Sequence, residues 1–408
     1  MDQRSGLMAP EESFPPAGRR LRLGVVGGGQ GAFIGEVHAG GARLSNRWEL
    51  VAGALSSDPE KAAASGRAWH LDPERSYADF RAMARAEGRR EDGIEAVAIT
   101  VPNALHAEVA TAFMEEGIDV ISDKPLTATL AEAEELAGVY RRTGVVYGVT
   151  YAYSAHVMAR QAREMVRAGL LGDLRQVHVE FLQDWAMNLT DATDPVPWRL
   201  DPARSGPSFT VGDIGTHAEH LARFVTGLAP EEVRADLHCA GAPKQLEDTA
   251  FVQVRWSGGV PGTLLVSQAF AGAQGGLRIR LSGSEAGLEW CQEEPEFLHF
   301  RPMGEPSRTL QRGEGAGMLP EAMRRLRVPR GHPEAFSDAW ANLYREMAIA
   351  IEARRGGVRL PEGVLDFPTF EDGLAGMRFV DAVLRSQEEG GWVRVRAGSR
   401  ESTGEAQP

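Results

Sequence analysis

The sequence predicts an α/β fold in which an N-terminal doubly wound parallel sheet precedes a C-terminal α+β domain with a large, mostly antiparallel open sheet. The chain has 408 residues, which is more than one hydrophobic core usually organises. Apolar runs alternate with amphipathic helical segments up to residue 152, and beyond it the hydrophobic period becomes that of strands. We expect a flexible segment at 1–20, domains at 21–152 and 153–396, and a disordered tail at 397–408.

The composition limits the kind of partner. The 44 basic and 57 acidic residues give a formal net charge of −13, which argues against binding to a nucleic-acid backbone. No run approaches the ~20 apolar residues that cross a bilayer, and the N-terminus has no apolar signal core. Cys239 and Cys291 lack metal-ligand spacing, so we expect them to be reduced and structural. These features predict a cytoplasmic protein that binds a small molecule, with no nucleic-acid or membrane partner.

Five short β-branched runs define the first domain. Between them, segments 104–117 and 129–144 place Ala, Leu, Val and Phe at helical spacing. Repetition of strand, helix and strand is typical of a parallel, doubly wound sheet, whose ligand binds beyond the carboxyl ends of the strands. The strands are expected at 21–26, 49–56, 94–102, 118–125 and 145–152.

The first strand runs into a glycine-rich turn, GVVGGGQGAFIG. A G-x-G-x-x-G/A pattern directly after a first strand is where the pyrophosphate of a dinucleotide approaches the backbone. The pattern fits if Ala32 takes its last position, but the extra residues before Gly35 leave the third glycine unassigned. The turn therefore predicts a dinucleotide-binding Rossmann domain. The expected cofactor contacts in it are Gly27, Gly29, Gly31, Ala32 and Phe33.

The second strand ends at Ser56 and Ser57, and Lys61 begins the next helix. Two hydroxyls and one cation suit a 2′-phosphate better than a free ribose 2′-hydroxyl, for which an acidic residue is usual. Asp58 is the competing feature, because a small backbone shift would turn it toward the ribose. We expect NADP as the preferred cofactor and NAD as the alternative.

The second domain begins with a helix expected at 155–172. Strands with alternating apolar residues follow, and they favour an antiparallel sheet with one covered face. These strands are expected at 175–181, 251–256 and 277–283, and later helices at 334–355 and 369–388.

Four segments together resemble the glucose-fructose oxidoreductase / inositol dehydrogenase / MocA-like (Gfo/Idh/MocA) family over roughly residues 20–396: the glycine-rich turn, ITVPNALH, SDKP and GDIGTH. The resemblance implies an NAD(P)-dependent oxidoreductase whose open sheet often forms the interface of a homo-oligomer, here a dimer or tetramer. The family usually has Glu-Lys-Pro where this chain has Asp123-Lys124-Pro125, and it implies a cis bond between Lys124 and Pro125.

Lys124, Asp213 and His217 match the catalytic residues of that family. Lys124 ends a predicted strand, where its ammonium can reach a reacting oxygen, although the position also fits a surface lysine. Asp213 and His217 lie four apart on a predicted helix and share a face. The carboxylate can therefore orient or polarise an imidazole that exchanges a proton, or hold an adjacent substrate hydroxyl. We expect Gly212 and Gly215 to let the start of this helix approach substrate and nicotinamide.

The same residues have plainer interpretations. Asp213 fits an N-cap, and His217 fits a core histidine whose hydrogen bonds are satisfied. A metal site made of Asp213, His217 and His220 is not expected, because these positions drift around the helix and no further Cys/His cluster joins them.

Further ligand contacts are expected from both halves. By resemblance, Pro102, Asn103 and His106 form a turn on the nicotinamide side, where Asn103 and His106 can bind the ribose or amide unless Asn103 only caps the next helix. Asp123, Lys124 and Pro125 complete the cofactor side. Besides the catalytic three, the residues expected to contact a polyhydroxylated substrate are Tyr151, Trp185, Trp198 and Arg199.

Oxidation of a secondary alcohol by a nicotinamide needs a hydride acceptor, a base and stabilisation of the alkoxide. The residues above therefore predict an oxidoreductase that interconverts a secondary alcohol and a ketone on a sugar, sugar derivative or cyclitol. One alternative is glycoside cleavage through transient oxidation by a tightly bound dinucleotide. The other is a non-catalytic dinucleotide or sugar sensor, which would have no need of a proton path.

Overall fold

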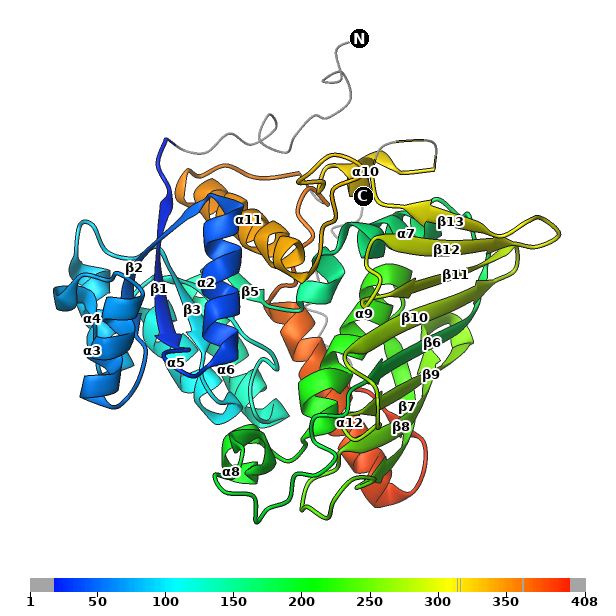
Figure 1. Ribbon diagram of the computed structural model, residues 1–408, viewed down its shortest axis with the longest axis horizontal. Coiled ribbons are helices and arrows are strands. Elements are labelled where there is room, and N and C mark those ends of the chain that lie inside the picture. The colour runs from blue at the N-terminus through cyan, green and yellow to red at the C-terminus, as the bar shows by residue number, and fades with distance from the viewer. Residues whose placement is uncertain (1–17, 314, 316, 362, 397–408) are drawn as a thin grey trace, which may run out of the picture.

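The computed structural model describes residues 18–313, 315, 317–361 and 363–396. Two sheets stand side by side, with helices packed around and between them (Figure 1). Most of the segment 1–20 and all of the tail 397–408 lie outside the described residues, so the expectations for those ends stay predictions.

The first sheet has five parallel strands in the order β2-β1-β3-β4-β5 and confirms the predicted doubly wound sheet. All five residues of the central strand β3 are buried, because helices cover both faces. The strands are β1 (Leu21–Gly27), β2 (Trp48–Ala54), β3 (Ala96–Thr100), β4 (Asp119–Ser122) and β5 (Tyr147–Val149). The helices of this half are α2 (Phe33–Ser45), α3 (Pro59–Ala68), α4 (Phe80–Arg89), α5 (His106–Glu115) and α6 (Leu130–Thr143).

The second sheet has nine strands in the order β13-β12-β11-β10-β6-β9-β8-β7-β14, and it is antiparallel except where β6 pairs with β9. Its strands are β6 (Leu174–Leu182), β7 (Pro230–His238), β8 (Thr249–Trp256), β9 (Val260–Ser267), β10 (Gly276–Gly283), β11 (Ala286–Cys291), β12 (Phe297–Pro302), β13 (Arg308–Gln311) and β14 (Val393–Arg394). The remaining helices are α7 (Val157–Arg167), α8 (Pro202–Ser205), α9 (Thr216–Thr226), α10 (Pro320–Met323), α11 (Phe336–Arg355) and α12 (Phe370–Glu389).

Residues of the second sheet alternate between a covered and an open face. In β8, Val252 and Val254 are buried in a core shared with α7, α9 and α12, whereas Gln253 and Arg255 are exposed. This alternation is the pattern that the sequence predicts for a sheet with one covered face. Within the described ranges, no helix has the length and hydropathy needed to cross a bilayer.

The last two long helices join the two halves. Helix α11 lies beside α2 against the first sheet (Figure 1), where Tyr344 packs in one core with Leu23. The Tyr344 hydroxyl lies 2.6 Å from His38 Nδ1, and its main-chain carbonyl accepts a 2.9 Å hydrogen bond from Trp48 Nε1. Helix α12 places Phe370 in the core of the first half and Phe379 in the core of the second. The strands of the first sheet end by Val149 and those of the second begin at Leu174, while the C-terminal helices return to the first sheet.

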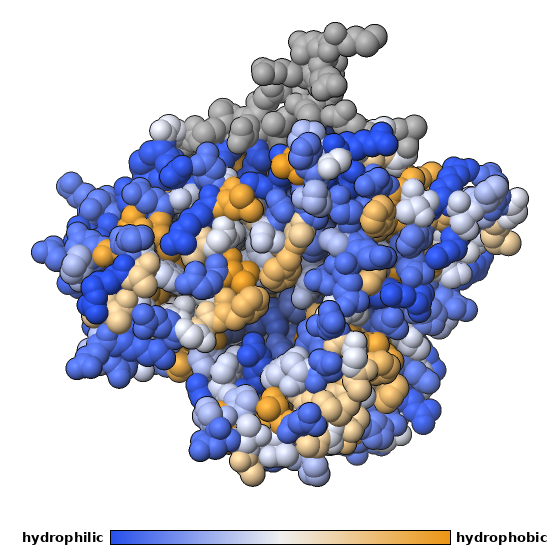
Figure 2. Space-filling model, in the orientation of Figure 1, coloured by the Kyte–Doolittle hydropathy of each residue, from blue (hydrophilic) through white to orange (hydrophobic). Residues whose placement is uncertain are grey.

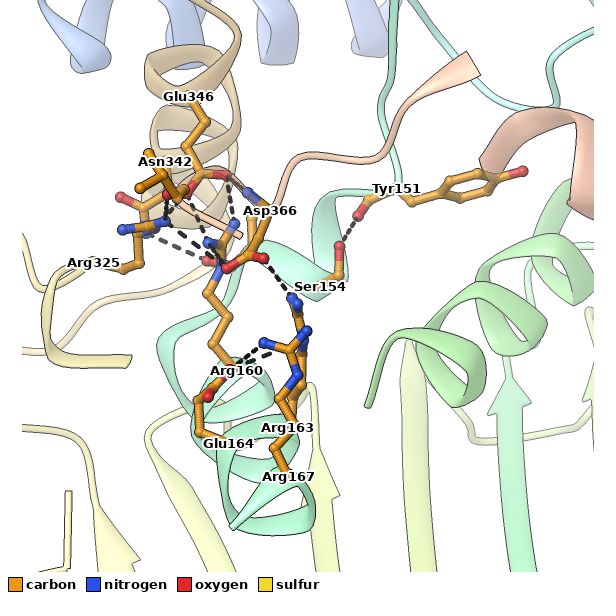
Figure 3. A network of polar contacts seen from close by, with 12 residues as sticks. Tyr151, Ser154, Arg160, Arg163, Glu164, Arg167, Arg325, Asn342, Glu346 and Asp366 are labelled. Atoms are coloured by element: carbon orange, nitrogen blue, oxygen red, sulfur yellow. Dashed lines mark hydrogen bonds and ion pairs between the residues drawn. The ribbon is translucent and has the colours of Figure 1, made fainter. Parts of the chain in front are cut away.

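A buried ionic network ties α7 to α11 (Figure 3). The Arg160 guanidinium donates to both Glu346 carboxylate oxygens at 2.7 and 3.0 Å, and both side chains are only 3% exposed. Arg325 also pairs with Glu346, and Asp366 lies 3.5 Å from Arg160. Burial alone would raise the pKa of Glu346, but Arg160 and Arg325 hold it at about 2. Glu346 is therefore ionised at neutral pH, and removal of Arg160 leaves a buried carboxylate with weaker compensation.

We predict that Arg160→Met lowers the free energy of unfolding by about 3–5 kcal/mol, because breaking one side of a buried ion pair strands the other charge. Urea unfolding followed by circular dichroism measures the change. The matched control is Arg175→Met on β6, whose side chain is 62% exposed and, among the described residues, pairs only with Asp173, at 3.4 Å. We expect less than about 1 kcal/mol for this control. Equal losses in the two variants would contradict the assigned role of Arg160.

Candidate active site

A cleft of about 1430 Å³ opens between the two halves, at the carboxyl ends of the strands of the first sheet. The space-filling view shows this hollow near the middle of the molecule, with hydrophilic side chains at its floor (Figure 2). Loops after β1, β2, β3 and β4 line one side, and residues 181–217 supply much of the other. The ligand-binding edge predicted for a doubly wound sheet and the second domain therefore face the same space.

The glycine-rich turn lines the cleft and packs tightly against helix α2. Gly27 has φ of 80°, and a Cβ added there would lie 2.5 Å from the Thr100 carbonyl oxygen. A Cβ on Gly35 would lie 2.1 Å from the Gly28 carbonyl oxygen. Gly28 and Gly35 therefore make the close contact between the turn and helix α2. Gly35 therefore takes the role of the third glycine, and the match that used Ala32 is corrected.

The start of α2 fits the pyrophosphate of a dinucleotide. Ala32 precedes its first turn and provides no side-chain cap, so the N–H groups there have no side-chain acceptor. Such a helix N-terminus favours an anionic oxygen. Gly31, with φ of 85°, has no atom within 4 Å of an added Cβ and lines the cleft. These features agree with the expected cofactor turn.

Ser56, Ser57 and Lys61 line the cleft at the end of β2, and Asp58 is not among the lining residues. The Asp58 carboxylate accepts a 3.0 Å hydrogen bond from the Lys61 main-chain N–H and caps α3. Its own N–H donates to the Ser56 hydroxyl at 3.2 Å. The acidic side chain is thus held at the helix terminus, while the two serines and the lysine face the cavity.

Pro102 and Asn103 line the cleft after β3. Asn103 Nδ2 donates to the Ser205 carbonyl at 2.9 Å, which ties this turn to α8 of the other half. His106 is corrected: it is fully buried outside the cleft lining, with Nδ1 2.8 Å from the Pro125 carbonyl and Nε2 2.9 Å from the Val101 carbonyl. It braces the turn and has no ring nitrogen left for a ribose or amide.

The Lys124–Pro125 bond is cis, in agreement with the resemblance. Asp123 and Lys124 line the cleft, and Pro125 does not. Asp123 accepts a 2.9 Å hydrogen bond from the Thr150 hydroxyl, which fixes its shorter side chain at the end of β4. Lys124 Nζ donates to the Asp213 main-chain carbonyl at 2.8 Å and also pairs with the Asp213 carboxylate.

The Asp213 carboxylate collects donors from several segments. Besides Lys124, Gln268 Nε2 donates to it at 2.7 Å and Arg199 Nε lies 3.4 Å away. The Gln268 amide is itself oriented, because its oxygen accepts a 3.0 Å hydrogen bond from the Thr210 hydroxyl. Burial alone would raise the pKa of Asp213, but Lys124, Arg199 and these hydrogen bonds hold it far below its usual range. Asp213 is therefore a fixed anion and not an N-cap.

Asp213 lies in a π-helical turn, Val211–Gly215, that leads into α9. The Thr216 N–H bonds to the Val211 carbonyl five residues back, and such wide turns recur at functional sites. The interpretation of Gly212 and Gly215 as sites of close ligand approach is wrong, because neither lines the cleft. A Cβ on Gly215 would lie 3.2 Å from Val211 Cγ1, so Gly215 serves packing within this turn.

His217 lies one turn beyond Asp213, in contact with the cleft. Its side chain is buried against the edges of Tyr151 and Tyr153, at centroid distances of 5.6 and 4.7 Å. Burial, and then the nearby Lys124 charge, lower its pKa well below the ordinary value, so the imidazole is neutral at neutral pH. Among the described residues, no group hydrogen-bonds to either ring nitrogen. It is thus an uncharged proton acceptor held ready in the cleft.

The substrate end holds some of the expected residues and several that sequence reasoning missed. Trp185, Trp198 and Arg199 line the cleft as expected, and the Arg199 guanidinium lies 4.5 Å above the Trp198 ring. Tyr151 is corrected, because it is buried behind His217 and stacks on His220 at 4.5 Å. The lining residues that were not anticipated here are Tyr153, Phe181, Gln183, Arg204, Phe336 and Trp340.

No group of three or more His, Cys, Asp or Glu side chains with metal-binding geometry occurs within the described part of the chain. His220 stacks on the Tyr151 ring, with the ring centroids 4.5 Å apart. Cys239 and Cys291 are both free thiols.

Two family models match the chain over the segments that build this cleft. An oxidoreductase family with an NAD-binding Rossmann fold matches residues 21–151, and the GFO/IDH/MocA C-terminal domain matches residues 159–289. The chain belongs to the Gfo/Idh/MocA oxidoreductase family. It is accordingly an enzyme, an oxidoreductase with an NAD-binding domain.

Several known proteins resemble this Gfo/Idh/MocA chain along nearly its whole length. The uncharacterized oxidoreductase YfiI of Bacillus subtilis is 35% identical over 92% of this chain and 97% of its own. An oxidoreductase from Sinorhizobium meliloti is 45% identical, with a TM-score of 0.83 over 92% of this chain and 99% of its own. An inositol dehydrogenase homolog from Azotobacter vinelandii, complexed with NAD+, is 36% identical, with a TM-score of 0.87 over 92% of this chain and 98% of its own.

The close contact of Gly28 with Gly35 predicts how a substitution changes the stability and dinucleotide affinity of this Gfo/Idh/MocA enzyme. Gly35→Ala forces the turn away from α2, so we expect about 1–3 kcal/mol lower stability from overpacking. We also expect dinucleotide binding weaker by on the order of tenfold, or ~1.4 kcal/mol. Thermal unfolding and fluorescence titration with reduced dinucleotide measure the two effects.

The matched control is Gly40→Ala on the same helix, where an added Cβ meets no atom within 4 Å. That change should raise stability by about 0.5–1 kcal/mol, because alanine restricts the unfolded chain and favours helix. Unaltered dinucleotide binding in Gly35→Ala would show that the turn tolerates the displacement.

Proposed function

We propose that the protein is an NAD(P)-dependent oxidoreductase that interconverts a secondary alcohol and a ketone on a sugar, sugar derivative or cyclitol. The observation that carries the proposal is the neutral, unbonded imidazole of His217 facing the same cleft as the Lys124–Asp213 pair and the glycine-rich turn. A proton acceptor, a cationic donor and a dinucleotide-binding edge are what the oxidation of an alcohol requires.

His217 acts as the general acid/base in this proposal. It takes the hydroxyl proton during oxidation and returns it during reduction. Asp213 is a poor base, because Lys124 and Arg199 stabilise its anion and keep its pKa very low. Its carboxylate instead orients the Lys124 ammonium, which donates to the reacting oxygen and stabilises alkoxide character. The nicotinamide, when bound, supplies the hydride acceptor or donor.

Polar and aromatic groups around His217 support a polyhydroxylated substrate. Trp185 and Trp198 offer flat faces for the C–H surface of a ring, and Gln183 and Arg199 offer hydrogen bonds to hydroxyls. The Azotobacter homolog named above also occurs as a complex with NADH and myo-inositol. We extend that substrate class, a ring with several hydroxyls, to this chain.

We propose NADP as the preferred cofactor. Ser56, Ser57 and Lys61 face the cavity, and the Asp58 carboxylate caps α3 instead of facing a ribose. A 2′-phosphate would gain two hydroxyl donors and one cation there. Because the Azotobacter homolog holds NAD+, the preference is proposed from this chain's own residues.

We also propose a cytoplasmic homo-oligomer, a dimer or tetramer. The two thiols are free, as is typical of proteins in a reducing compartment. The outer face of the nine-stranded sheet carries the half-exposed Phe251 between the polar residues of β8. Family resemblance supports this face as the contact between subunits.

The role of His217 is tested by His217→Ala, for which we expect kcat to fall by about 10²–10⁴-fold while dinucleotide affinity stays unchanged. The pH profile of alcohol oxidation gives a second test. Because the pKa of His217 is lowered, its neutral basic form persists as pH falls. The acidic limb of kcat/KM should therefore lie below the ordinary histidine value of about 6.5. His332→Ala, at an exposed histidine in a turn outside the nine-stranded sheet, is the control. Near-normal turnover across pH in His217→Ala would remove it from the mechanism.

The cofactor preference is tested by Ser57→Asp. A carboxylate at this corner should repel the 2′-phosphate and accept from a 2′-hydroxyl, so NADPH affinity should fall at least about tenfold, or ~1.4 kcal/mol, while NADH affinity holds or rises. Lys61→Gln should weaken NADPH alone. Fluorescence titration of both dinucleotides decides the matter, and equal losses for the two would refute the assignment of this corner to the phosphate.

A further inference from the structure

A second cavity of about 290 Å³ lies on helix α9, separate from the cleft and assigned to nothing so far. Residues of α7, α9 and the segment 366–372 form its walls. We propose that it binds a small phosphorylated molecule of about the size of a sugar phosphate.

The charged walls favour an anion. Three guanidinium groups, those of Arg163, Arg167 and Arg223, line the cavity against the two carboxylates of Asp366 and Asp372. With a neutral His220, the lining itself has three cations and two anions, while Glu164 and Glu219 pair with Arg167 and Arg223 from outside the lining. Planar guanidinium groups match the paired oxygens of a phosphate, which makes arginine the usual residue for binding it.

Of the three arginines in the lining, Arg167 is the most available to a ligand, because the other two are held in ion pairs. Arg163 donates to Asp366 at 2.7 Å, and Arg223 donates to Asp372 at the same distance. Arg167 is 55% exposed, and its one ion pair within the described ranges is with Glu164, at 3.3 Å. Figure 3 shows Arg163 and Arg167 together on α7, with Arg163 extended toward Asp366. A ligand phosphate can thus engage Arg167 without first breaking a buried pair.

A buried histidine, His220, also lines this cavity. His220 is 3% exposed, and its ring faces are covered by Tyr151 at 4.5 Å and by Phe224 at 6.0 Å. Burial and charges are the causes that act on this ring, and no hydrogen bond to its nitrogens is among them within the described residues. Burial and nearby Arg223 lower the pKa of His220 to about 3, so its ring is neutral and carries one N–H donor. A phosphate oxygen in the cavity would give that donor its partner.

The volume sets the size of the ligand. A water molecule takes up about 30 Å³ in the liquid, so the cavity has room for roughly ten waters. Inorganic phosphate fills only part of that space, and a phosphate ester with a small sugar fills more. A dinucleotide is too large, which separates this cavity from the cleft of about 1430 Å³.

The cavity is placed to influence His217, and this part of the inference rests on the proposed function. His220 lies three residues after His217 on α9, and the Tyr151 ring contacts both imidazoles. A ligand that fixes His220 therefore acts on His217 through one packed ring. Binding should change kcat by severalfold and leave dinucleotide affinity unchanged.

The direct test is calorimetric titration of the full chain with inorganic phosphate and, separately, with glucose 6-phosphate, in the presence of saturating reduced dinucleotide. We expect glucose 6-phosphate to bind more tightly than phosphate, and Arg167→Gln to weaken both by at least about tenfold, or ~1.4 kcal/mol. Arg175→Gln, an exposed arginine on β6, is the matched control and should bind as the unmodified chain does. Because calorimetry does not require turnover, the result is independent of the proposed reaction.

Three outcomes would overturn the proposal. The first is the absence of binding by either probe. The second is phosphate binding that survives Arg167→Gln unchanged, which would place it outside this cavity. The third is equally tight binding of malonate, lost in the same variant, which would identify a site for carboxylates instead of phosphates.

Discussion

The ion pair between Lys124 and Asp213 is the interaction on which the site depends. Lys124 follows β4 of the first sheet, and Asp213 lies in the turn that leads into α9 of the second half. Both side chains are mostly buried, at 12% and 16% exposure, so neither charge can be left without its partner. The pair therefore fixes the distance between the cofactor-binding edge and the helix that carries His217.

The groups around this pair compensate its two buried charges. Gln268 donates a hydrogen bond to the Asp213 carboxylate, Arg199 adds a second cation 3.4 Å away, and the Asp213 carbonyl in the wide turn before α9 accepts from Lys124. Lys124 and Gln268 donate hydrogen bonds to the Asp213 carboxylate, so its oxygens do not hold His217 in place. The imidazole stays neutral because it is buried beside a cation. One electrostatic arrangement thus produces both a fixed anion and an uncharged proton acceptor.

Sequence reasoning found the elements whose signal is local. The five strands of the first sheet, the turn after β1 and the residues Lys124, Asp213 and His217 all follow from short patterns, and they converge in one cleft. It failed where the destination of a side chain depends on tertiary packing. Tyr151 and His106 are residue types that often contact ligands, but here both are buried and support neighbouring segments. Trp340 reaches the cleft only because α11 returns to the first sheet, and no local pattern records that return. Gln268 lies 55 residues from Asp213, so spacing could not pair them.

Helix α9 shows how one element can hold two histidines in the same protonation state for different reasons. Burial is the largest cause of the lowered pKa for both His217 and His220. The second cause differs, since Lys124 acts on His217 and Arg223 acts on His220. Arg223 is itself held by Glu219 and Asp372, so its charge is fixed in place next to the ring. Each imidazole therefore has its own electrostatic surroundings, while Tyr151, packed against both, makes the position of one ring depend on the position of the other.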